Sequence, residues 1–365
     1  MIRKIVAILV VVLGILLLYL LFMPVAVDPQ SWQSPPNPGY KGDFAVNERL
    51  KGLETFPIGD TYGPEDIALD KLGRIYAATH NGTIVRLQPD GSNPEAWAQT
   101  GGRPLGIDFD GNGNLIVADA FQGLLSITPE GEISLLTEEA GGIPIRYADD
   151  VDVARNGLIY FSDASTKFGA KAYGGTYEAS LLDLMEHGLY GRLLVYNPDS
   201  GETTVLLDKL SFANGVAVSH DQSYVLVNET GAYRVIRYWI EGPQKGRHET
   251  FGPIFASFPD NISAGQEGRY WVALVSPRSK PLDSLSDKPF LRKIVQRLPS
   301  AIRPKAKPYG HIVALNENGE VIADLQDPDA GYPINTSVTE TDRYLYIGSL
   351  FTKELGRLPK QNLSL

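Results

Sequence analysis

An all-β fold, a six-bladed β-propeller preceded by one transmembrane helix, is predicted by three features of this 365-residue sequence. A short strand, a turn rich in Gly, Asn or Asp, and a second strand recur six times along the chain. Alternating apolar residues between such turns are typical of β-strands, and further hairpins complete units of four strands. An uncharged apolar run stands at the N-terminus. An ordinary β-sandwich would not repeat one strand-initiating segment six times, so the propeller is the better interpretation.

The N-terminal run, residues 5–23, contains no charged or strongly polar side chain. As a helix it is about 30 Å long, which matches the hydrocarbon core of a bilayer. Arg3 and Lys4 precede it, so we expect residues 1–4 to be cytoplasmic and the propeller to be extracytoplasmic, in a periplasm, an extracellular space or a lumen. A cleaved signal peptide is the alternative, but the run is long and Pro24-Val25-Ala26 is a poor cleavage site. We therefore predict the signal-anchor of a single-pass membrane protein, which contacts the lipid bilayer through residues 5–23.

Residues 24–55 are rich in proline and have few periodic apolar positions, which predicts an extended linker. The propeller is predicted over residues 56–360. Its six strand-initiating segments share an apolar run that follows a polar or small residue, and they are 63–70, 103–110, 147–153, 212–218, 258–263 and 334–339. Two repeats are longer than the others and carry insertions near 166–190 and 277–308.

The composition excludes several classes of protein. The absence of cysteine rules out disulfides, a cysteine nucleophile and a zinc-thiolate site. With 43 acidic and 33 basic residues the formal charge is −10, which argues against a nucleic-acid partner. No Gly-x-Ser-x-Gly elbow and no phosphate-binding Gly-Lys-Ser loop occur, so serine-hydrolase and nucleotide-dependent functions lose support.

Basic residues concentrate in one segment, 278–307, which has nine of them against two acidic residues and a net charge of +7. Phe290 and Leu291 begin a set of apolar residues at near-helical spacing there. The pattern predicts a basic amphipathic helix. Two interpretations of this helix stay open. Residues 288–307 could contact a membrane surface, or they could form a lid over the channel mouth whose outer face is solvated.

The histidines give little support to histidine-based catalysis. His187 falls in the first insertion, which could form a short lid helix, and we expect this side chain at the surface. His311 opens an outer-type strand.

The innermost strands of a propeller bring equivalent positions together around the axis. The six repeats align on one column, which consists of Glu65, Leu105, Asp149, Asn214, Asp260 and Thr336. Carboxylates packed around such a channel repel one another unless a cation compensates them, and hard oxygen ligands favour Ca²⁺, or another divalent cation, over zinc. Asn261 could contribute to the same site or hold its neighbour in place. The alternative is that each Asp or Asn only caps backbone groups in turns.

The sequence resembles the strictosidine synthase-like family, close to its animal adipocyte plasma membrane-associated branch, and more distantly the paraoxonases and the gluconolactonases of the senescence-marker type. The resemblance covers nearly all of residues 60–355. The segments that carry it include Gly63-Pro64-Glu65, Gly102-Arg103-Pro104-Leu105-Gly106, Gly191-Arg192-Leu193-Leu194, Phe212-Ala213-Asn214-Gly215-Val216-Ala217, Pro259-Asp260-Asn261-Ile262 and Tyr344-Leu345-Tyr346-Ile347-Gly348-Ser349.

This resemblance implies an axial Ca²⁺ site. Glu65 matches the Glu of the hydrolase relatives, Asn214 one of their Asn ligands and Asp260 their Asp. Asn261 matches the Asn that follows this Asp in paraoxonases. Asp149 stands where the relatives usually have Asn, which keeps an oxygen ligand but adds a negative charge.

Two departures from the relatives bear on the reaction. Thr336 stands where the plant synthases have their catalytic Glu, so the condensation of an amine with an aldehyde lacks its acid–base group. Leu105 replaces the paraoxonase His. We therefore predict a Ca²⁺-dependent hydrolase of a small-molecule ester or lactone, similar to arylesterases and lactonases, in which Asp260 deprotonates the attacking water. A non-catalytic, membrane-tethered propeller with a structural metal and a synthase of the condensing type are the alternatives.

Overall fold

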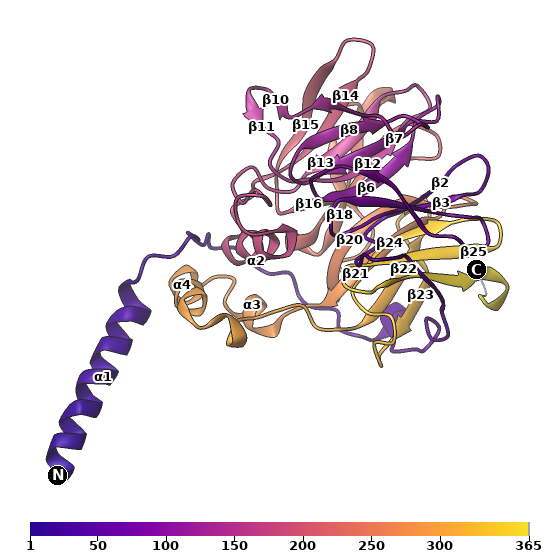
Figure 1. Ribbon diagram of the computed structural model, residues 1–365. Helices are drawn as coiled ribbons and strands as arrows, with labels where there is room; N and C mark the ends of the chain where they lie inside the picture. The colour runs from indigo at the N-terminus through magenta and orange to yellow at the C-terminus, as the bar shows by residue number, and fades with distance from the viewer. Residues whose placement is uncertain (364–365) are drawn as a thin grey trace.

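Six antiparallel sheets of four strands each form a ring in the computed structural model, which describes residues 1–363 (Figure 1). Blades 1 and 2 consist of β2 (Ile67–Leu69), β3 (Ile75–Ala78), β4 (Thr83–Leu87), β5 (Glu95–Gln99), β6 (Pro104–Phe109), β7 (Leu115–Asp119), β8 (Gly123–Ile127) and β9 (Ile133–Thr137). Blades 3 and 4 consist of β12 (Ala148–Val153), β13 (Ile159–Asp163), β14 (Gly191–Asn197), β15 (Glu202–Leu210), β16 (Ala213–Val218), β17 (Tyr224–Glu229), β18 (Arg234–Trp239) and β19 (His248–Phe251). Blades 5 and 6 consist of β20 (Ser257–Ala264), β21 (Tyr270–Pro277), β22 (Gly310–Leu315), β23 (Val321–Asp327), β24 (Asn335–Glu340), β25 (Tyr344–Ser349), β26 (Glu354–Pro359) and β1 (Glu54–Pro57).

The first strand of each blade is the innermost one. These six strands contact one another in sequence order, from β2 through β6, β12, β16 and β20 to β24, and β24 returns to β2. A short additional hairpin, β10 (Glu139–Ala140) and β11 (Ile143–Pro144), precedes blade 3. The predicted six-bladed propeller is therefore confirmed, with four strands in each blade.

The ring is closed by strand pairing between the two ends of the chain. β1 pairs antiparallel with β26, with Glu54 opposite Arg357, so the last blade takes its outermost strand from the N-terminal side. Such pairing covers the edge of β26 and leaves only the short strand β1 at the edge of blade 6. It also explains how a chain without cysteine holds its ring shut.

Aspartates on the innermost strands fasten neighbouring blades to one another. Each accepts a backbone N–H from the next blade, in the pairs Asp66 Oδ2 with Ile107 N at 2.9 Å, Asp108 Oδ2 with Val153 N at 2.9 Å, Asp150 Oδ2 with Val216 N at 2.7 Å and Asp152 Oδ2 with Val218 N at 2.7 Å. These bonds satisfy backbone donors that face the channel rather than a ladder partner. These bonds between blades were not predicted from the repeat pattern.

The predicted linker, residues 24–55, has no helix or strand apart from η1 (Gly42–Phe44) and the first two residues of β1, which belong to blade 6, and it lies against the propeller. Trp32 N donates to Ser286 O at 3.1 Å, and the Trp32 ring stacks on His187 with centroids 3.8 Å apart. His187 Nδ1 lies 3.1 Å from Ser211 Oγ, and its side chain is 7% exposed. The expectation of a surface His187 is wrong, because Trp32 arrives from a distant part of the sequence and covers it.

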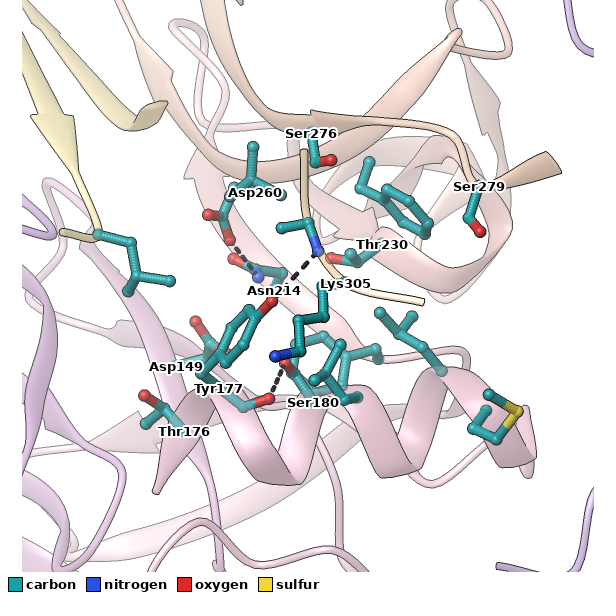
Figure 2. Close-up of a pocket in the computed structure, with 18 of the residues that line it drawn as sticks. Asp149, Thr176, Tyr177, Ser180, Asn214, Thr230, Asp260, Ser276, Ser279 and Lys305 are labelled. Atoms are coloured by element: carbon teal, nitrogen blue, oxygen red, sulfur yellow. Dashed lines mark hydrogen bonds between the residues drawn. The ribbon is translucent and has the colours of Figure 1, made fainter. Parts of the chain in front are cut away.

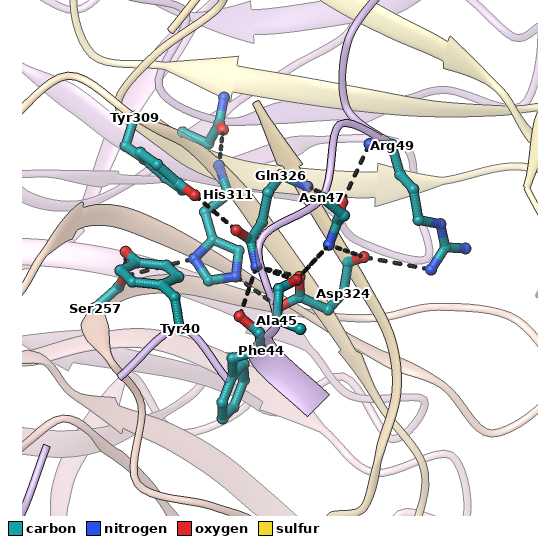
Figure 3. A network of polar contacts seen from close by, with 11 residues as sticks. Tyr40, Phe44, Ala45, Asn47, Arg49, Ser257, Tyr309, His311, Asp324 and Gln326 are labelled. Carbon is teal, nitrogen blue, oxygen red and sulfur yellow. Dashed lines mark hydrogen bonds and ion pairs between the residues drawn. The ribbon is translucent and has the colours of Figure 1, made fainter. Parts of the chain in front are cut away.

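A second part of the same segment docks on blade 5 through a buried polar network (Figure 3). Ser257 Oγ lies 2.8 Å from Tyr40 Oη and 3.4 Å from His311 Nδ1, while His311 Nε2 lies 2.7 Å from Asp324 Oδ2. Serine, histidine and aspartate stand in the order of a hydrolase triad, but the rings of Tyr40 and Phe44 pack around His311. The network is therefore a structural joint.

The N-terminal helix α1 (Ile2–Phe22) contains the predicted run 5–23 apart from its last residue, and none of its residues is buried. Its mean hydropathy reaches 3.3, and it is the one helix among the described residues that is long and apolar enough to cross a membrane. It projects away from the ring (Figure 1).

The two insertions form helices on one side of the ring. The first contains α2 (Thr176–Glu186), and the second contains α3 (Lys280–Ser284), α4 (Pro289–Arg297) and the 3₁₀ turn η4 (Ser300–Ile302). α2, α3 and α4 lie on the side from which α1 leaves (Figure 1). Three further 3₁₀ turns are η1 (Gly42–Phe44), η2 (Thr230–Ala232) and η3 (Gly242–Gln244), and η5 (Lys360–Asn362) follows the last strand.

Candidate functional site

A cavity of about 120 Å³ lies at the end of the channel that the inserted helices cover (Figure 2). Several water molecules or a small acyl group would fit into such a volume. Its walls are mainly apolar and are formed by Leu105, Phe212, Phe258, Val275, Leu282 and Leu350. Its floor is polar, because Glu65, Asp149, Asn214 and Asp260 reach it from four different blades. An apolar pocket with a few convergent polar groups is the usual form of a small-molecule site.

The innermost strands direct these side chains through β-bulges. The register of β12 shifts between Ala148 and Val151, and that of β20 shifts between Pro259 and Ile262. Corresponding shifts occur in β6, β16 and β24. A bulge adds an unpaired residue and re-aims side chains. Asp149 and Asp260 therefore turn toward the pocket instead of following the strict alternation of a strand.

The residues that directly follow Glu65, Asp149 and Asp260 line a different cavity from the one these three side chains reach. Asp66, Asp150 and Asn261 line this second cavity, together with Asp108 and Asp152. Asn261 was predicted in the same site as Asp260, and the structure places it between the two cavities, lining the second one and reaching Glu65 of the first. Its Nδ2 donates to Glu65 Oε1 at 3.3 Å. Sequence reasoning missed this second acidic cavity, although neighbouring acidic pairs such as Glu65-Asp66 and Asp149-Asp150 were a readable signal.

The three carboxylates of the pocket are buried and close enough to affect one another. Burial raises the pKa of Glu65 well above its usual value, and the charges of Asp260 and Asp149 raise it further. Burial and the charge of Asp260 likewise raise the pKa of Asp149. Burial raises the pKa of Asp260 to about 7, although a hydrogen bond from Asn214 opposes this shift. The site therefore resists carrying three negative charges unless a positive charge compensates them.

Arg103 supplies part of that positive charge and was not predicted as a site residue. Its side chain is 2% exposed, and its charge lowers the pKa of both Glu65 and Asp149. Its Nη1 donates to Pro104 O at 2.9 Å, whereas its Nε and Nη2 have no hydrogen-bond partner among the described residues.

The amide side chains donate to the carboxylates and leave oxygen atoms unpaired. Asn214 Nδ2 donates to Asp260 Oδ1 at 2.6 Å (Figure 2). Asn214 Oδ1, Asn261 Oδ1 and Glu65 Oε2 are buried and have no hydrogen-bond partner within residues 1–363. Buried polar atoms without partners are uncommon and call for an explanation.

These unpaired oxygens allow a test of the predicted metal. Across the described part of the chain, no three Asp, Glu, His or Cys side chains are placed so that they could hold a metal ion by themselves. An ion would therefore depend on the amide oxygens of Asn214 and Asn261 as well as on the carboxylates. Unpaired, buried oxygens of both kinds are the ligands that Ca²⁺ takes, so the residues fit a hard divalent cation.

The remaining two positions of the axial column play supporting roles. Leu105 lines the apolar wall of the pocket. Thr336 Oγ1 donates to Glu65 O at 2.6 Å, and Ser337 Oγ donates to the same oxygen at 2.8 Å. Thr336 therefore holds the backbone of Glu65 and brings no acid into the pocket.

The roof of the pocket comes from the two insertions. Tyr177 and Ser180 on α2 face Lys305 of the second insertion across the cavity (Figure 2). The backbone N–H of Ala306 donates to Tyr177 Oη at 3.1 Å, which joins the two insertions directly. A short lid helix was predicted here from the sequence, and α2 is that helix.

The fold and this pocket define a six-bladed propeller with a covered, acid-lined site on its axis. A strictosidine synthase family model matches residues 149–243, and a model of the strictosidine synthase-like N-terminal region matches residues 42–87. Strictosidine synthase-like 6 of Arabidopsis thaliana is 37% identical over 88% of this chain and 86% of its own length. The adipocyte plasma membrane-associated protein of Rattus norvegicus is 34% identical over 92% of this chain and 94% of its own length. The chain belongs to the strictosidine synthase-like family.

Solved structures with low sequence identity to this chain have the same propeller architecture. A gluconolactonase from Xanthomonas campestris superposes with a TM-score of 0.61 at 15% identity, covering 91% of this chain and 96% of that one. The calcium-binding protein regucalcin from Agrobacterium tumefaciens gives a TM-score of 0.58 at 13% identity, covering 84% of this chain and 93% of that one. At these identities the likeness establishes the fold.

Proposed function

We propose that this protein is a membrane-anchored hydrolase of esters or lactones that uses a divalent cation. Ca²⁺ is the cation we propose first, and another divalent cation is the alternative. One observation carries the proposal: an apolar pocket ends on buried carboxylates whose neighbouring oxygens have no partner. Propellers of the same fold are named as a gluconolactonase and as a calcium-binding protein, which supports both parts of the proposal. Glu65, Asp149, Asn214, Asp260 and Asn261 would hold the cation.

When bound, the cation would polarise the carbonyl of the substrate as a Lewis acid. The protein's own residues provide the proton transfer and the environment. The pKa of Asp260 is about 7 in the cation-free pocket, and a bound cation would lower it, so this carboxylate would be ionised at neutral pH and able to accept the proton of the attacking water. Asn214 Nδ2 orients the Asp260 carboxylate from 2.6 Å. Water adds to the acyl carbon, the bond from that carbon to the alkoxy oxygen breaks, and the proton passes through Asp260 to that oxygen. The products are a carboxylic acid and an alcohol, joined in one molecule when the substrate is a lactone.

The apolar walls determine the class of substrate. Phe212 and Phe258 beside the acidic floor exclude water from the acyl portion and favour a substrate without its own charge there. The condensing reaction of the plant synthases gains no support, because the hydroxyl of Thr336 is already bonded to Glu65 O.

α1 supports the anchored location. Arg3 and Lys4 precede its uncharged span, which favours a cytoplasmic N-terminus and an extracytoplasmic propeller. The rat relative is named as a plasma membrane-associated protein, which agrees with an anchor.

A panel of aryl esters and lactones tests the reaction. The full-length protein, purified in detergent, should hydrolyse at least one of them, lose this turnover when a chelator is added, and regain it with Ca²⁺. The chelator removes the cation that compensates the buried carboxylates and leaves the protein chain unchanged, so turnover should return when Ca²⁺ is added back. Binding of Ca²⁺ without any turnover would favour the non-catalytic tethered propeller instead.

Stability should depend on pH and cation together. The pKa of Asp260 is about 7 in the folded protein and those of Glu65 and Asp149 are also raised, so the folded state holds more protons than the unfolded state above about pH 4. With chelator present, the free energy of unfolding should therefore fall as pH rises toward and beyond 7. Ca²⁺ should raise the melting temperature more at pH 8 than at pH 5, measured by calorimetry. An equal rise at both values would contradict the proposed ligand set.

A further inference from the structure

The second insertion joins the pocket to the end of α1. We call residues 279–307, which contain α3, α4 and η4, the arm. On the sequence alone the arm was expected to be a helix with basic residues on its polar face. In the structure, Arg292 is 0% exposed and Arg297 is 8% exposed. Two of its cations thus point into the protein, so the basic residues of α4 do not form the outward surface that the sequence pattern indicated.

The buried arginines fasten the arm to backbone carbonyls. Arg292 Nη1 donates to Met185 O at 2.9 Å, and its Nη2 donates to Gln30 O. Arg297 Nη1 donates to Leu20 O at 3.0 Å, and its Nε donates to Met23 O. Carbonyls in the last turn of a helix have no partner within the helix, and a cation there also complements the helix dipole. Arg297 therefore caps α1 and fixes α4 at the level where the apolar span ends.

The outward surface of the arm is instead partly apolar. Phe290 is 54% exposed, Leu291 is 40% exposed and Ile302 is 65% exposed. Besides the buried Arg292 and Arg297, four more cations of the arm form no ion pair among the described residues, and they are Lys280, Arg303, Lys305 and Lys307. Exposed large apolar side chains with unpaired cations beside them suit a surface of lipid headgroups and acyl chains.

The same arm forms part of the pocket. Leu282, Pro304, Lys305 and Ala306 line the cavity, and Ile302 stands only two residues before Pro304. α2, α3 and α4 all lie on the side from which α1 leaves (Figure 1). The covered end of the pocket and the end of α1 are therefore on one side of the molecule.

From this arrangement we propose that the arm lies on the bilayer that holds α1, with Phe290, Leu291 and Ile302 inserted among the lipids. The pocket then opens at the membrane surface and takes an amphiphilic ester or lactone, with an acyl chain, directly from the bilayer. This substrate class rests on the proposed hydrolase function, whereas the docking of the arm does not. We assign the bilayer as the occupant of the exposed face because the end of α1 is bonded to α4. When the apolar span of α1 crosses a bilayer, α4 is therefore held at the surface of that bilayer.

Site-directed labels test the docking on the full-length chain. The protein has no cysteine, so Phe290→Cys and Ile302→Cys each give one labelling site for a fluorophore. In nanodiscs of phosphatidylcholine and phosphatidylglycerol that contain brominated lipid, both labels should be quenched. Leu72→Cys and Leu135→Cys are matched controls, because these leucines are 72% and 52% exposed in blades 1 and 2, and their labels should not be quenched. Equal quenching at 290, 302 and 72 would overturn the docking.

A label on α1 separates the failure of the anchor from the failure of the arm. Leu13→Cys lies in the middle of the apolar span and should be quenched whenever α1 is embedded. Quenching at 13 without quenching at 290 and 302 would contradict the docking alone. No quenching at 13 would contradict the proposed anchor and the docking with it.

Kinetics in the same nanodiscs test the substrate class. The double variant Phe290→Ser with Ile302→Ser should raise KM for a long-chain aryl ester in the bilayer by roughly tenfold, because the apolar contact with lipid is lost. Its kcat/KM for a short, water-soluble ester should match that of Leu72→Ser with Leu135→Ser. An equal loss on both esters would contradict delivery from the bilayer. A protein that hydrolyses neither ester would contradict the proposed function, while the label data would still decide the docking.

Discussion

Asp260→Asn is expected to lower the turnover of the best ester or lactone by roughly 10²–10⁴-fold, the range for losing a general base. The substitution keeps the size of the side chain and one oxygen, so the shape of the pocket should remain. It removes the group that can accept a proton near pH 7 and to which Asn214 donates at 2.6 Å. Steady-state kinetics at saturating Ca²⁺, with a circular dichroism spectrum to confirm folding, measure the effect.

Asp324→Asn provides the matched control for this variant. Asp324 is also a buried aspartate, but it pairs with His311 at 2.7 Å in the joint on blade 5 and does not line the pocket. Its replacement should lower stability and leave kcat unchanged. If Asp260→Asn retained wild-type turnover, Asp260 would not be the base and the mechanism would have to be assigned to another carboxylate of the pocket.

Asp163→Ala is expected to lower the free energy of unfolding by about 3–5 kcal/mol, the cost of leaving a buried charge unpaired. Asp163 Oδ2 lies 2.6 Å from Arg192 Nη2, and the two side chains are 0% and 5% exposed. Asp163 Oδ1 also accepts the backbone N–H of Tyr147 at 3.0 Å. Since Tyr147 lines the pocket two residues before Asp149, we expect cation binding to weaken as well. Urea denaturation followed by tryptophan fluorescence measures the loss.

An exposed ion pair serves as the comparison. Glu54 Oε2 lies 2.6 Å from Arg357 Nη2 across β1 and β26, but the Glu54 side chain is 47% exposed. Glu54→Ala should therefore change the free energy of unfolding by about 0–1 kcal/mol. If Asp163→Ala and Glu54→Ala lowered the free energy of unfolding by similar amounts, burial would not be what makes the Asp163–Arg192 ion pair strong.

Local patterns in the sequence were sufficient for the fold. The six repeated segments follow the strand period of two, and each of them lies in or next to an innermost strand such as β12 or β20. The uncharged run 5–23 likewise corresponds to α1 (Ile2–Phe22), because a helix of that length needs no tertiary partner to be recognised. Equivalent positions in the repeats also identified four polar residues that line the pocket, since the ring brings such positions to one axis.

Other features of the site depended on contacts between distant parts of the chain. The division of neighbouring acidic residues, with Asp149 in the pocket and Asp150 in the second cavity, follows from a register shift in β12. A strand pattern assigns alternate residues to opposite faces, but it does not locate a bulge. Arg103 could be recognised as a charge near the site only when Glu65 and Asp149 were placed beside it.

The sequence by itself determined the ring, the apolar N-terminal helix and the composition of the axial column, because each depends on the period or length of a local pattern. The tertiary structure decided where the side chains point and what covers them. His187 is buried by Trp32, and Arg297 turns inward to cap α1, because partners from more than a hundred residues away occupy those positions. Burial and charge compensation depend on such partners, and a linear pattern does not contain them.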